Sequence, residues 1–235
     1  MNTIKPKDRV LVAIDTTDVS RAAGWARSLA GLVGGVKIGK EFFTAHGPDG
    51  ARRLTEGGQP LFLDLKFHDI PNTVAGAISA SLPLKPFIVN VHAAGGPAMM
   101  KAAAEAARQA GADRPLVIAV TVLTSLDASD LAAVGVAGTV EDQVIRLATL
   151  ARDSGLDGVV CSAHEIAAIR GACGPDFKLV VPGIRPAGAE TGDQKRVMTP
   201  KDAIAAGADY LVIGRPITAA PDPAQAARDI AADMA

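Results

Sequence analysis

The sequence alternates, from one end to the other, between short apolar runs and longer stretches with helical periodicity. Eight such runs begin at or near residues 10, 35, 60, 86, 115, 157, 178 and 210, and the stretches between them are rich in alanine. Strands that are apolar along nearly their whole length are typical of parallel sheets that helices cover on both faces. Eight strand–helix units in 235 residues therefore predict an α/β fold, a closed (β/α)8 TIM barrel that forms one domain over residues 1–235.

Two phosphate-binding motifs that mark other common parallel folds are missing from the sequence. No GxGxxG follows the first apolar run, and GxxxxGK[ST] does not occur anywhere in the chain. A dinucleotide-binding sheet and a nucleoside triphosphatase fold therefore lack their usual signatures, and the sequence favours the barrel.

Composition limits the classes of partner. The net charge is −1 and aromatic residues make up 3% of the chain, so the basic excess and the stacking side chains typical of nucleic-acid binding are both lacking. No apolar stretch reaches the ~18 residues of a membrane-spanning helix. The apolar run that begins at Val10 is also too short for a secretion signal. These features predict a cytoplasmic protein that binds neither nucleic acid nor a membrane.

Metal binding is not expected. Cys161 and Cys173 form no CxxC pair, and none of the 4 histidines stands at ligand spacing from another ligand. We expect both cysteines to be reduced, buried thiols. We expect His68 and His92 to support the neighbouring charged strands through hydrogen bonds.

Charged side chains occur where the first three apolar runs end. They are Asp15 in the first run, Lys37 in the second, Asp64 and Lys66 in the third, and Asp69 in the loop that follows. Because barrel active sites lie at the carboxyl ends of the strands, these side chains should meet at one end of the barrel. A single strand-end aspartate is often only a cap or a solvated residue. Unpaired charges are costly to bury, however, so the alternating set predicts a mutually neutralising cluster.

The ends of the seventh and eighth runs predict a phosphate site, which many barrels place there. Gly214 lets a backbone N–H approach an anion, and the adjacent Arg215 offers a bidentate guanidinium. A long polar loop at 182–196 follows the seventh run and contains Arg185 and Gln194. Loops of this length in compact domains are often active-site lids, so we expect a phosphorylated small-molecule substrate.

The surroundings of Lys66 indicate proton transfer rather than Schiff-base chemistry. A lysine that forms a Schiff base must be neutral, whereas the flanking carboxylates of Asp64 and Asp69 should keep Lys66 protonated. A protonated lysine can donate a proton to a carbanion and stabilise the negative charge as it develops.

The segment DLKFHDIPNT at residues 64–73 resembles the signature of the orotidine 5′-monophosphate decarboxylase family. The resemblance covers essentially the whole chain, because VAID, VKIGKEFF, VTVLTS, PGIRP and IGRPI also occur in the family's order and spacing. The shorter pattern DxKxxD is shared with 3-keto-L-gulonate 6-phosphate decarboxylase and a hexulose-phosphate synthase, whereas the HDIPNT continuation separates the two branches. The resemblance implies conversion of orotidine 5′-monophosphate to uridine 5′-monophosphate, the last step of de novo pyrimidine synthesis, without a cofactor.

The resemblance also implies roles for individual residues. Lys66 protonates C6 of the pyrimidine after carbon dioxide has left, Asp64 lies beside the departing carboxylate, and Lys37 and Asp69 complete the catalytic charge network. It implies a homodimer in which Asp69, Ile70 and Thr73 reach into the partner's site. The further substrate-binding residues that it implies are Asp15 and Lys37 for the ribose, Thr124 and Ser125 for the pyrimidine, and Arg185, Gln194, Gly214 and Arg215 for the phosphate.

Two other hypotheses remain at this point. One is another phosphosugar lyase on the same barrel, which requires Mg²⁺ or a Schiff base. The other is a catalytically inactive barrel that binds a pyrimidine monophosphate or serves in an assembly. The intact set of Asp64, Lys66 and Asp69 argues against an inactive barrel, and the HDIPNT segment argues against the lyase.

Overall fold

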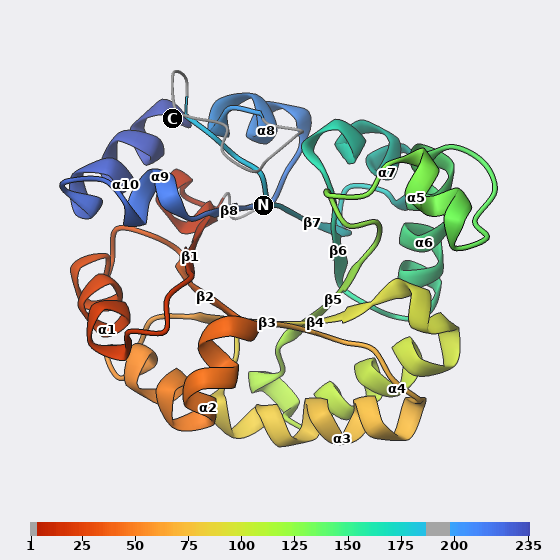
Figure 1. The fold of residues 1–235 in the computed structure, drawn as a ribbon, viewed down its shortest axis with the longest axis horizontal. Helices are drawn as coiled ribbons and strands as arrows, with labels where there is room; N and C mark the ends of the chain where they lie inside the picture. Colours follow the sequence, from red (N-terminus) through yellow and green to blue (C-terminus); the bar gives the residue numbers. More distant parts are fainter. Residues whose placement is uncertain (1–3, 187–197) are drawn as a thin grey trace.

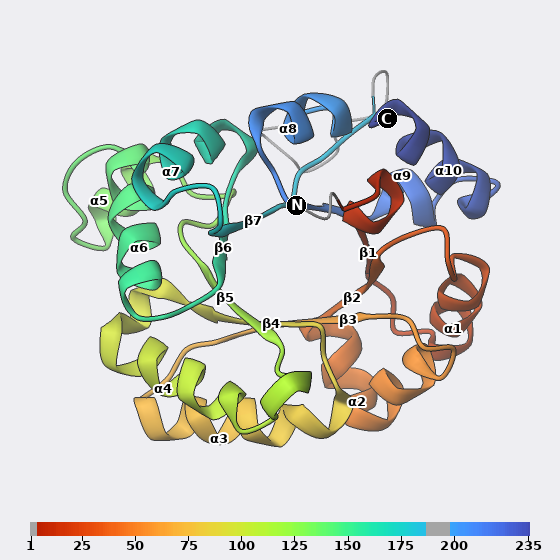
Figure 2. The ribbon, with the colours of Figure 1, turned by 180° about the vertical axis from the view of Figure 1, so that it is seen from behind.

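The computed structural model is a closed barrel of eight parallel strands inside a ring of helices (Figure 1). It describes residues 4–186 and 198–235. Each strand pairs with the next along the chain, and β8 returns to pair with β1, so no strand edge is left open. The view from behind shows the same ring of helices around the strands (Figure 2). The prediction of a (β/α)8 barrel is therefore confirmed.

All eight apolar runs form strands. Their bounds are β1 Val10–Ile14, β2 Gly35–Gly39, β3 Leu61–Phe67, β4 Ile88–His92, β5 Leu116–Val120, β6 Gly158–Val160, β7 Lys178–Val181 and β8 Tyr210–Ile213. The helices are α1 Val19–Ser28, α2 Lys40–Thr55, α3 Pro71–Ser81, α4 Gly96–Arg108, α5 Ala128–Ala133, α6 Val140–Asp153, α7 Ile166–Cys173, α8 Pro200–Ala206, α9 Arg215–Thr218 and α10 Pro223–Asp233.

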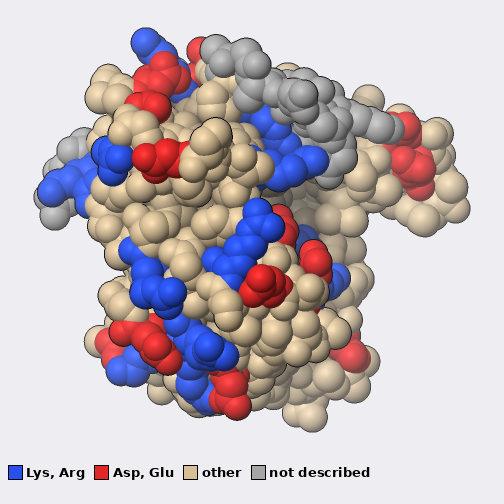
Figure 3. Space-filling model, turned by 60° about the vertical axis from the view of Figure 1, so that its left-hand side comes forward, with Lys and Arg blue, Asp and Glu red and all other residues tan. Residues whose placement is uncertain are grey.

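Local sequence signals account for where several helices begin. Asp18 caps α1 by accepting hydrogen bonds from two backbone N–H groups of its first turn. Thr139 and Asp142 form a reciprocal capping box at the start of α6. Alanine-rich faces, as in α4, let the helices pack closely against the outside of the barrel. On the face drawn in Figure 3, basic and acidic side chains are interspersed.

The two faces of each strand divide the apolar residues into two cores. The larger core lies between the strands and the helices, and a smaller one fills the barrel interior. The interior core consists of Leu11, Phe62, Ile88, Ile118, Val180 and Tyr210, each fully or almost fully buried. Because side chains alternate along a strand, the residues that follow on the same face point into the barrel mouth. Strand β1 shows this order, with Leu11 in the interior core and then Ala13 and Asp15 in the cavity above it.

Among the residues that the structure describes, no helix is both long enough and apolar enough to cross a bilayer.

Candidate active site

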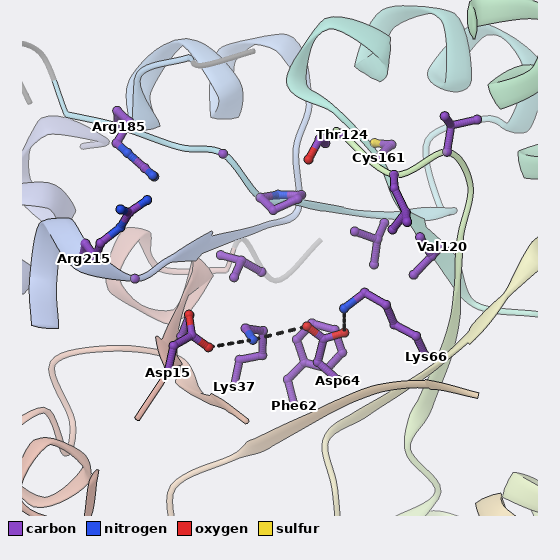
Figure 4. A pocket seen from close by; sticks show the side chains of 18 residues that line it. Asp15, Lys37, Phe62, Asp64, Lys66, Val120, Thr124, Cys161, Arg185 and Arg215 are labelled. Carbon is purple, nitrogen blue, oxygen red and sulfur yellow. Dashed lines mark hydrogen bonds and ion pairs between the residues drawn. The ribbon is translucent and has the colours of Figure 1, made fainter. Parts of the chain in front are cut away.

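A cavity of about 430 Å³ opens at the carboxyl ends of the strands. Figure 4 shows its lining side chains, which converge from opposite sides of the barrel. One side carries Lys37, Asp64 and Lys66, and the opposite side carries Arg185 and Arg215. The wall between them is largely apolar and includes Phe62, Val120, Val122, Leu123, Val160, Cys161 and Pro182. This combination of a mostly apolar wall with a few convergent charges is typical of a small-molecule site.

A row of alternating charges crosses one side of the cavity. Lys37 Nζ lies 3.6 Å from Asp15 Oδ1 and 3.2 Å from Asp64 Oδ2. Lys66 Nζ donates a hydrogen bond to Asp64 Oδ1 at 2.5 Å. The side chains of Lys37 and Asp64 are only 9% and 11% exposed, so the two charges neutralise each other away from bulk water.

Asp64 is the centre of this row and is held in its ionised form. Burial by itself raises the pKa of Asp64. The positive charges of Lys37 and Lys66, and the hydrogen bonds from Lys66 and Asn90, outweigh burial and lower the pKa below its ordinary value. At neutral pH an ionised Asp64 therefore fixes both ammonium groups at one side of the cavity.

Lys66 occupies an irregular part of β3. Leu63 pairs with Val89 on β4, but Phe67 pairs with Val91, so residues 64–66 all stand opposite Asn90. Lys66 itself has φ of +53°, in the left-handed region. That conformation costs an L-residue about 1–2 kcal/mol, so other contacts must stabilise it. A bulge therefore interrupts the regular alternation of β3 between Leu63 and Phe67. The side chains of Asp64 and Lys66 nevertheless both line the cavity.

His92 ends β4 close to these charges, and its ring centroid lies 5.5 Å from that of His68. Burial first, and then the positive charges of His68, Lys40 and Lys66, lower the pKa of His92 from 6.5 to about 4. The imidazole is therefore neutral at neutral pH and adds no further positive charge beside Lys66.

This shifted pKa predicts a pH dependence of stability. Between pH 6.5 and pH 4 the unfolded chain binds a proton at His92 that the folded chain does not, so the free energy of unfolding falls as pH falls through that range. His92→Gln should remove this part of the slope in urea titrations at several pH values. The exposed His164 supplies the control, because His164→Gln should leave the slope unchanged. An identical slope for wild type and His92→Gln would contradict the assignment.

The opposite side of the cavity carries two guanidinium groups (Figure 4). Arg185 follows β7 and is 9% exposed, whereas Arg215 follows β8 and is more open to solvent. Burial, and then the positive charge of Arg215, lower the pKa of Arg185. Two cations directed at one region of a partly dehydrated cavity form a favourable site for an anion such as phosphate.

The structure brings together most of the residues predicted for the site. Asp15, Lys37, Asp64, Lys66, Thr124, Arg185, Gly214 and Arg215 all line the cavity. Ser125 is exposed and lies beside the lining rather than in it. Gln194 lies outside the described residues.

Three predicted residues are not part of this cavity. Asp69, Ile70 and Thr73 are exposed, and the Asp69 carboxylate accepts a hydrogen bond from the backbone N–H of Ile70 at 2.7 Å. The expectation that Asp69 and Asp64 flank Lys66 within one chain is therefore not met. In the described chain Asp69 is exposed and is not among the residues that line the cavity.

Two features of the site were not assigned from the sequence. The apolar wall could not be told from ordinary strand core, because both consist of the same residue types. Asn90 was visible as a polar residue late in the fourth apolar run, but nothing in the sequence paired it with the third. In the structure it is fully buried and bonds to both Asp64 and Lys66.

Cys161 also lines the cavity, but its thiol is not activated. Burial, and then the charge of Glu165, raise the pKa of Cys161, so this thiol stays protonated at neutral pH. In the part of the chain that the structure describes, no three His, Cys, Asp or Glu side chains are grouped so that they could hold a metal ion.

Comparison with known proteins places this geometry in a family. Residues 8–230 match the family described as "Orotidine 5'-phosphate decarboxylase / HUMPS family". The chain belongs to this family. Among curated relatives of the orotidine 5′-phosphate decarboxylase / HUMPS family, it is 59% identical to "Orotidine 5'-phosphate decarboxylase" of Rhodospirillum rubrum, over 96% of this chain and 93% of that protein. It is 57% identical to the protein of the same name from Paramagnetospirillum magneticum, over 96% of this chain and 97% of that protein.

A solved structure of the family has the same fold. The crystal structure of orotidine 5′-phosphate decarboxylase from Lactobacillus acidophilus superimposes with a TM-score of 0.86 at 37% sequence identity, over 96% of this chain and 98% of that one. The family resemblance found in the sequence is therefore confirmed along nearly the whole chain.

Proposed function

We propose that this chain decarboxylates orotidine 5′-monophosphate to uridine 5′-monophosphate, the last step of de novo pyrimidine synthesis, with no cofactor. The names of the two curated relatives support this reaction over the other activities of the family. The observation that carries the proposal is the arrangement of the cavity. Lys66 lies against an ionised carboxylate at one side, and two arginines lie at the other.

The reaction needs a proton donor at one carbon of the pyrimidine ring. When the bond between C6 and the carboxylate breaks, carbon dioxide leaves and the electron pair stays on C6, in the plane of the ring. No π system delocalises that pair, so the site itself must stabilise the charge. We assign this task to the Lys66 ammonium, which also transfers a proton to C6 and then recovers one from solvent.

The remaining charges position this donor and the substrate. Asp64 holds Lys66 and Lys37 in place, and we assign it the position beside the departing carboxylate. Asp15 and Lys37 form the end of the charge row away from Lys66, which suits contacts with the ribose hydroxyls (Figure 4). Thr124 lines the cavity wall and suits contact with the pyrimidine.

Arg215→Ala should weaken substrate binding through the phosphate. A charge-assisted bidentate contact contributes about 1.5–3 kcal/mol, so KM should rise roughly 10- to 100-fold. The nucleoside orotidine, which has no phosphate, should be turned over equally by wild type and variant. Arg228→Ala on the exposed side of α10 is the matched control. A KM for orotidine 5′-monophosphate that stays at the wild-type value would exclude Arg215 from the phosphate site.

The positions of Asp69, Ile70 and Thr73 support a homodimer with shared sites. All three are exposed in the single chain, and Ile70 is 66% exposed, which is unusual for a large apolar side chain. We infer that a second copy covers this surface and receives Asp69 in its own cavity. The cytoplasmic location expected from the sequence stays a prediction.

The test is the ultraviolet absorbance of orotidine 5′-monophosphate mixed with EDTA-treated protein. Loss of the orotate band, with uridine 5′-monophosphate as product, would support both the reaction and its independence of metal. No change with EDTA, and activity on a phosphosugar once Mg²⁺ is restored, would favour the lyase. Tight binding of a pyrimidine monophosphate without turnover would favour an inactive barrel.

A further inference from the structure

Asn90 connects two strands beneath the active site. It lies in β4, is 0% exposed, and is not among the residues that line the cavity in the described part of the chain. Its Oδ1 accepts a hydrogen bond from the backbone N–H of Lys66 at 2.8 Å, and its Nδ2 donates to Asp64 Oδ1 at 2.7 Å. These two contacts also fix the amide orientation, because a flipped side chain would direct a donor at an N–H group and an acceptor at a carboxylate.

The bulge in β3 makes the first of these contacts necessary. Pairing between the strands stops at Leu63 with Val89 and resumes only at Phe67 with Val91. The Lys66 N–H lies in this interruption, on a residue with φ of +53°. The side chain of Asn90 supplies the acceptor for that partly buried N–H group.

The second contact joins the backbone of Lys66 to its side chain. Asp64 Oδ1 accepts both from Asn90 Nδ2 and from Lys66 Nζ, the latter at 2.5 Å. A closed ring of hydrogen bonds therefore runs from the Lys66 N–H through Asn90 and Asp64 to the Lys66 ammonium. The backbone of Lys66 therefore bonds to Asn90 directly, and its ammonium group is joined to the same amide through the Asp64 carboxylate.

We propose that Asn90 is a positioning residue for the proton donor. It stabilises the left-handed backbone of Lys66, orients the Asp64 carboxylate, and so directs the ammonium group without touching the substrate. This inference rests on the proposed function, since it concerns the direction in which Lys66 delivers its proton. By this inference, proton transfer needs the Asn90 amide on β4 as well as the charged side chains on β2 and β3.

The first test replaces the amide with an apolar side chain of similar size. Asn90→Leu removes both hydrogen bonds, and displacement of a catalytic group by about 1 Å can cost roughly 100-fold in rate. We expect kcat to fall by that order while KM for orotidine 5′-monophosphate changes little, because the arginines are on the far side of the cavity. Thr121→Val is the matched control. It removes a partly buried hydrogen bond from Thr121 Oγ1 to the Val160 carbonyl on β6 and should leave kcat unchanged.

The second test uses pH and separates positioning from simple structural support. In Asn90→Asp the new carboxyl group matches the amide in shape and, when protonated, can accept from the Lys66 N–H and donate to Asp64. Once ionised it can no longer donate, and it repels Asp64. The charged groups that contact this position are Asp64 and Lys66 from β3, and its β5 neighbour Ile118 is apolar. Burial and the charge of Asp64 raise the pKa of the new group, whereas the positive charge of Lys66 lowers it. Because only the protonated form can donate to Asp64, kcat relative to wild type should rise as the pH is lowered through that pKa.

The outcomes distinguish the inference from the proposed function. Wild-type protein without decarboxylase activity would refute the proposed function itself. An active wild type together with an unchanged kcat in Asn90→Leu would overturn the positioning role. If Asn90→Leu does not fold, Asn90→Asp still decides, because a ratio to wild type that does not change with pH would also overturn it.

Discussion

Lys66→Ala should lose essentially all decarboxylase activity. The substitution removes both the proton donor and the positive charge that faces the developing carbanion. General acid catalysis contributes about 10²–10⁴-fold, and one preorganised electrostatic donor about 10²–10³-fold. We therefore expect kcat to fall by at least ~10⁴-fold, measured as the loss of orotate absorbance at saturating substrate.

The fold should survive this change. Asp64 keeps its ion pair with Lys37 and its hydrogen bond from Asn90, so no buried carboxylate is left without a partner. The thermal unfolding midpoint should stay near that of wild type, and uridine 5′-monophosphate should still bind. Lys101→Ala on the exposed face of α4 is the matched control and should retain full activity. Turnover within a few fold of wild type in Lys66→Ala would refute the assignment of Lys66 as the proton donor.

The sequence was sufficient to predict the barrel and most of the charged site. Its eight apolar runs became the eight strands, because a strand buried on both faces leaves a continuous apolar signal. Polar residues at the ends of those runs then had to meet at one end of the barrel. This reasoning predicted one charged cluster with Asp15, Lys37 and Asp64 and a phosphate site with Arg215, and in the structure all four residues line one cavity.

The contacts around Lys66 could not be predicted in this way. Regular alternation puts Asp64 and Lys66 on one face, but it assumes an unbroken strand, whereas the pairing of β3 with β4 shifts between Leu63 and Phe67. The residue opposite a bulge is set by strand register, which depends on the three-dimensional packing of both strands. Asn90 is 24 residues from Lys66 in the chain, so its role became visible only in the structure.

Asp69 shows a second limit of reasoning from sequence alone. It is three residues from Lys66, and that proximity suggested a carboxylate on each side of the lysine. Short separation in a loop does not fix direction, and the folded chain exposes Asp69 instead. The family resemblance offered another arrangement, in which Asp69 acts in the site of a second subunit.

That arrangement predicts complementation between two inactive proteins. Lys66→Ala keeps Asp69, and Asp69→Ala keeps Lys66, so each is inactive as a homodimer if the site is shared. In a two-fold symmetric dimer each site combines Lys66 of one subunit with Asp69 of its partner. A hybrid of the two variants therefore contains one intact site and one site that lacks both residues.

The expected recovery follows from random exchange of subunits. An equal mixture forms hybrids as about half of all dimers, and one of the two sites in each hybrid is intact, so activity should reach about a quarter of the wild-type value per site. Mixing after partial denaturation and refolding allows the exchange, and differently tagged subunits measure the hybrid fraction. Lys66→Ala refolded with Lys66→Ala is the control and should stay inactive. Hybrids that form in the expected proportion but have no activity would mean that each subunit builds its site alone. Asp69 would then have to reach Lys66 by a movement of its own loop.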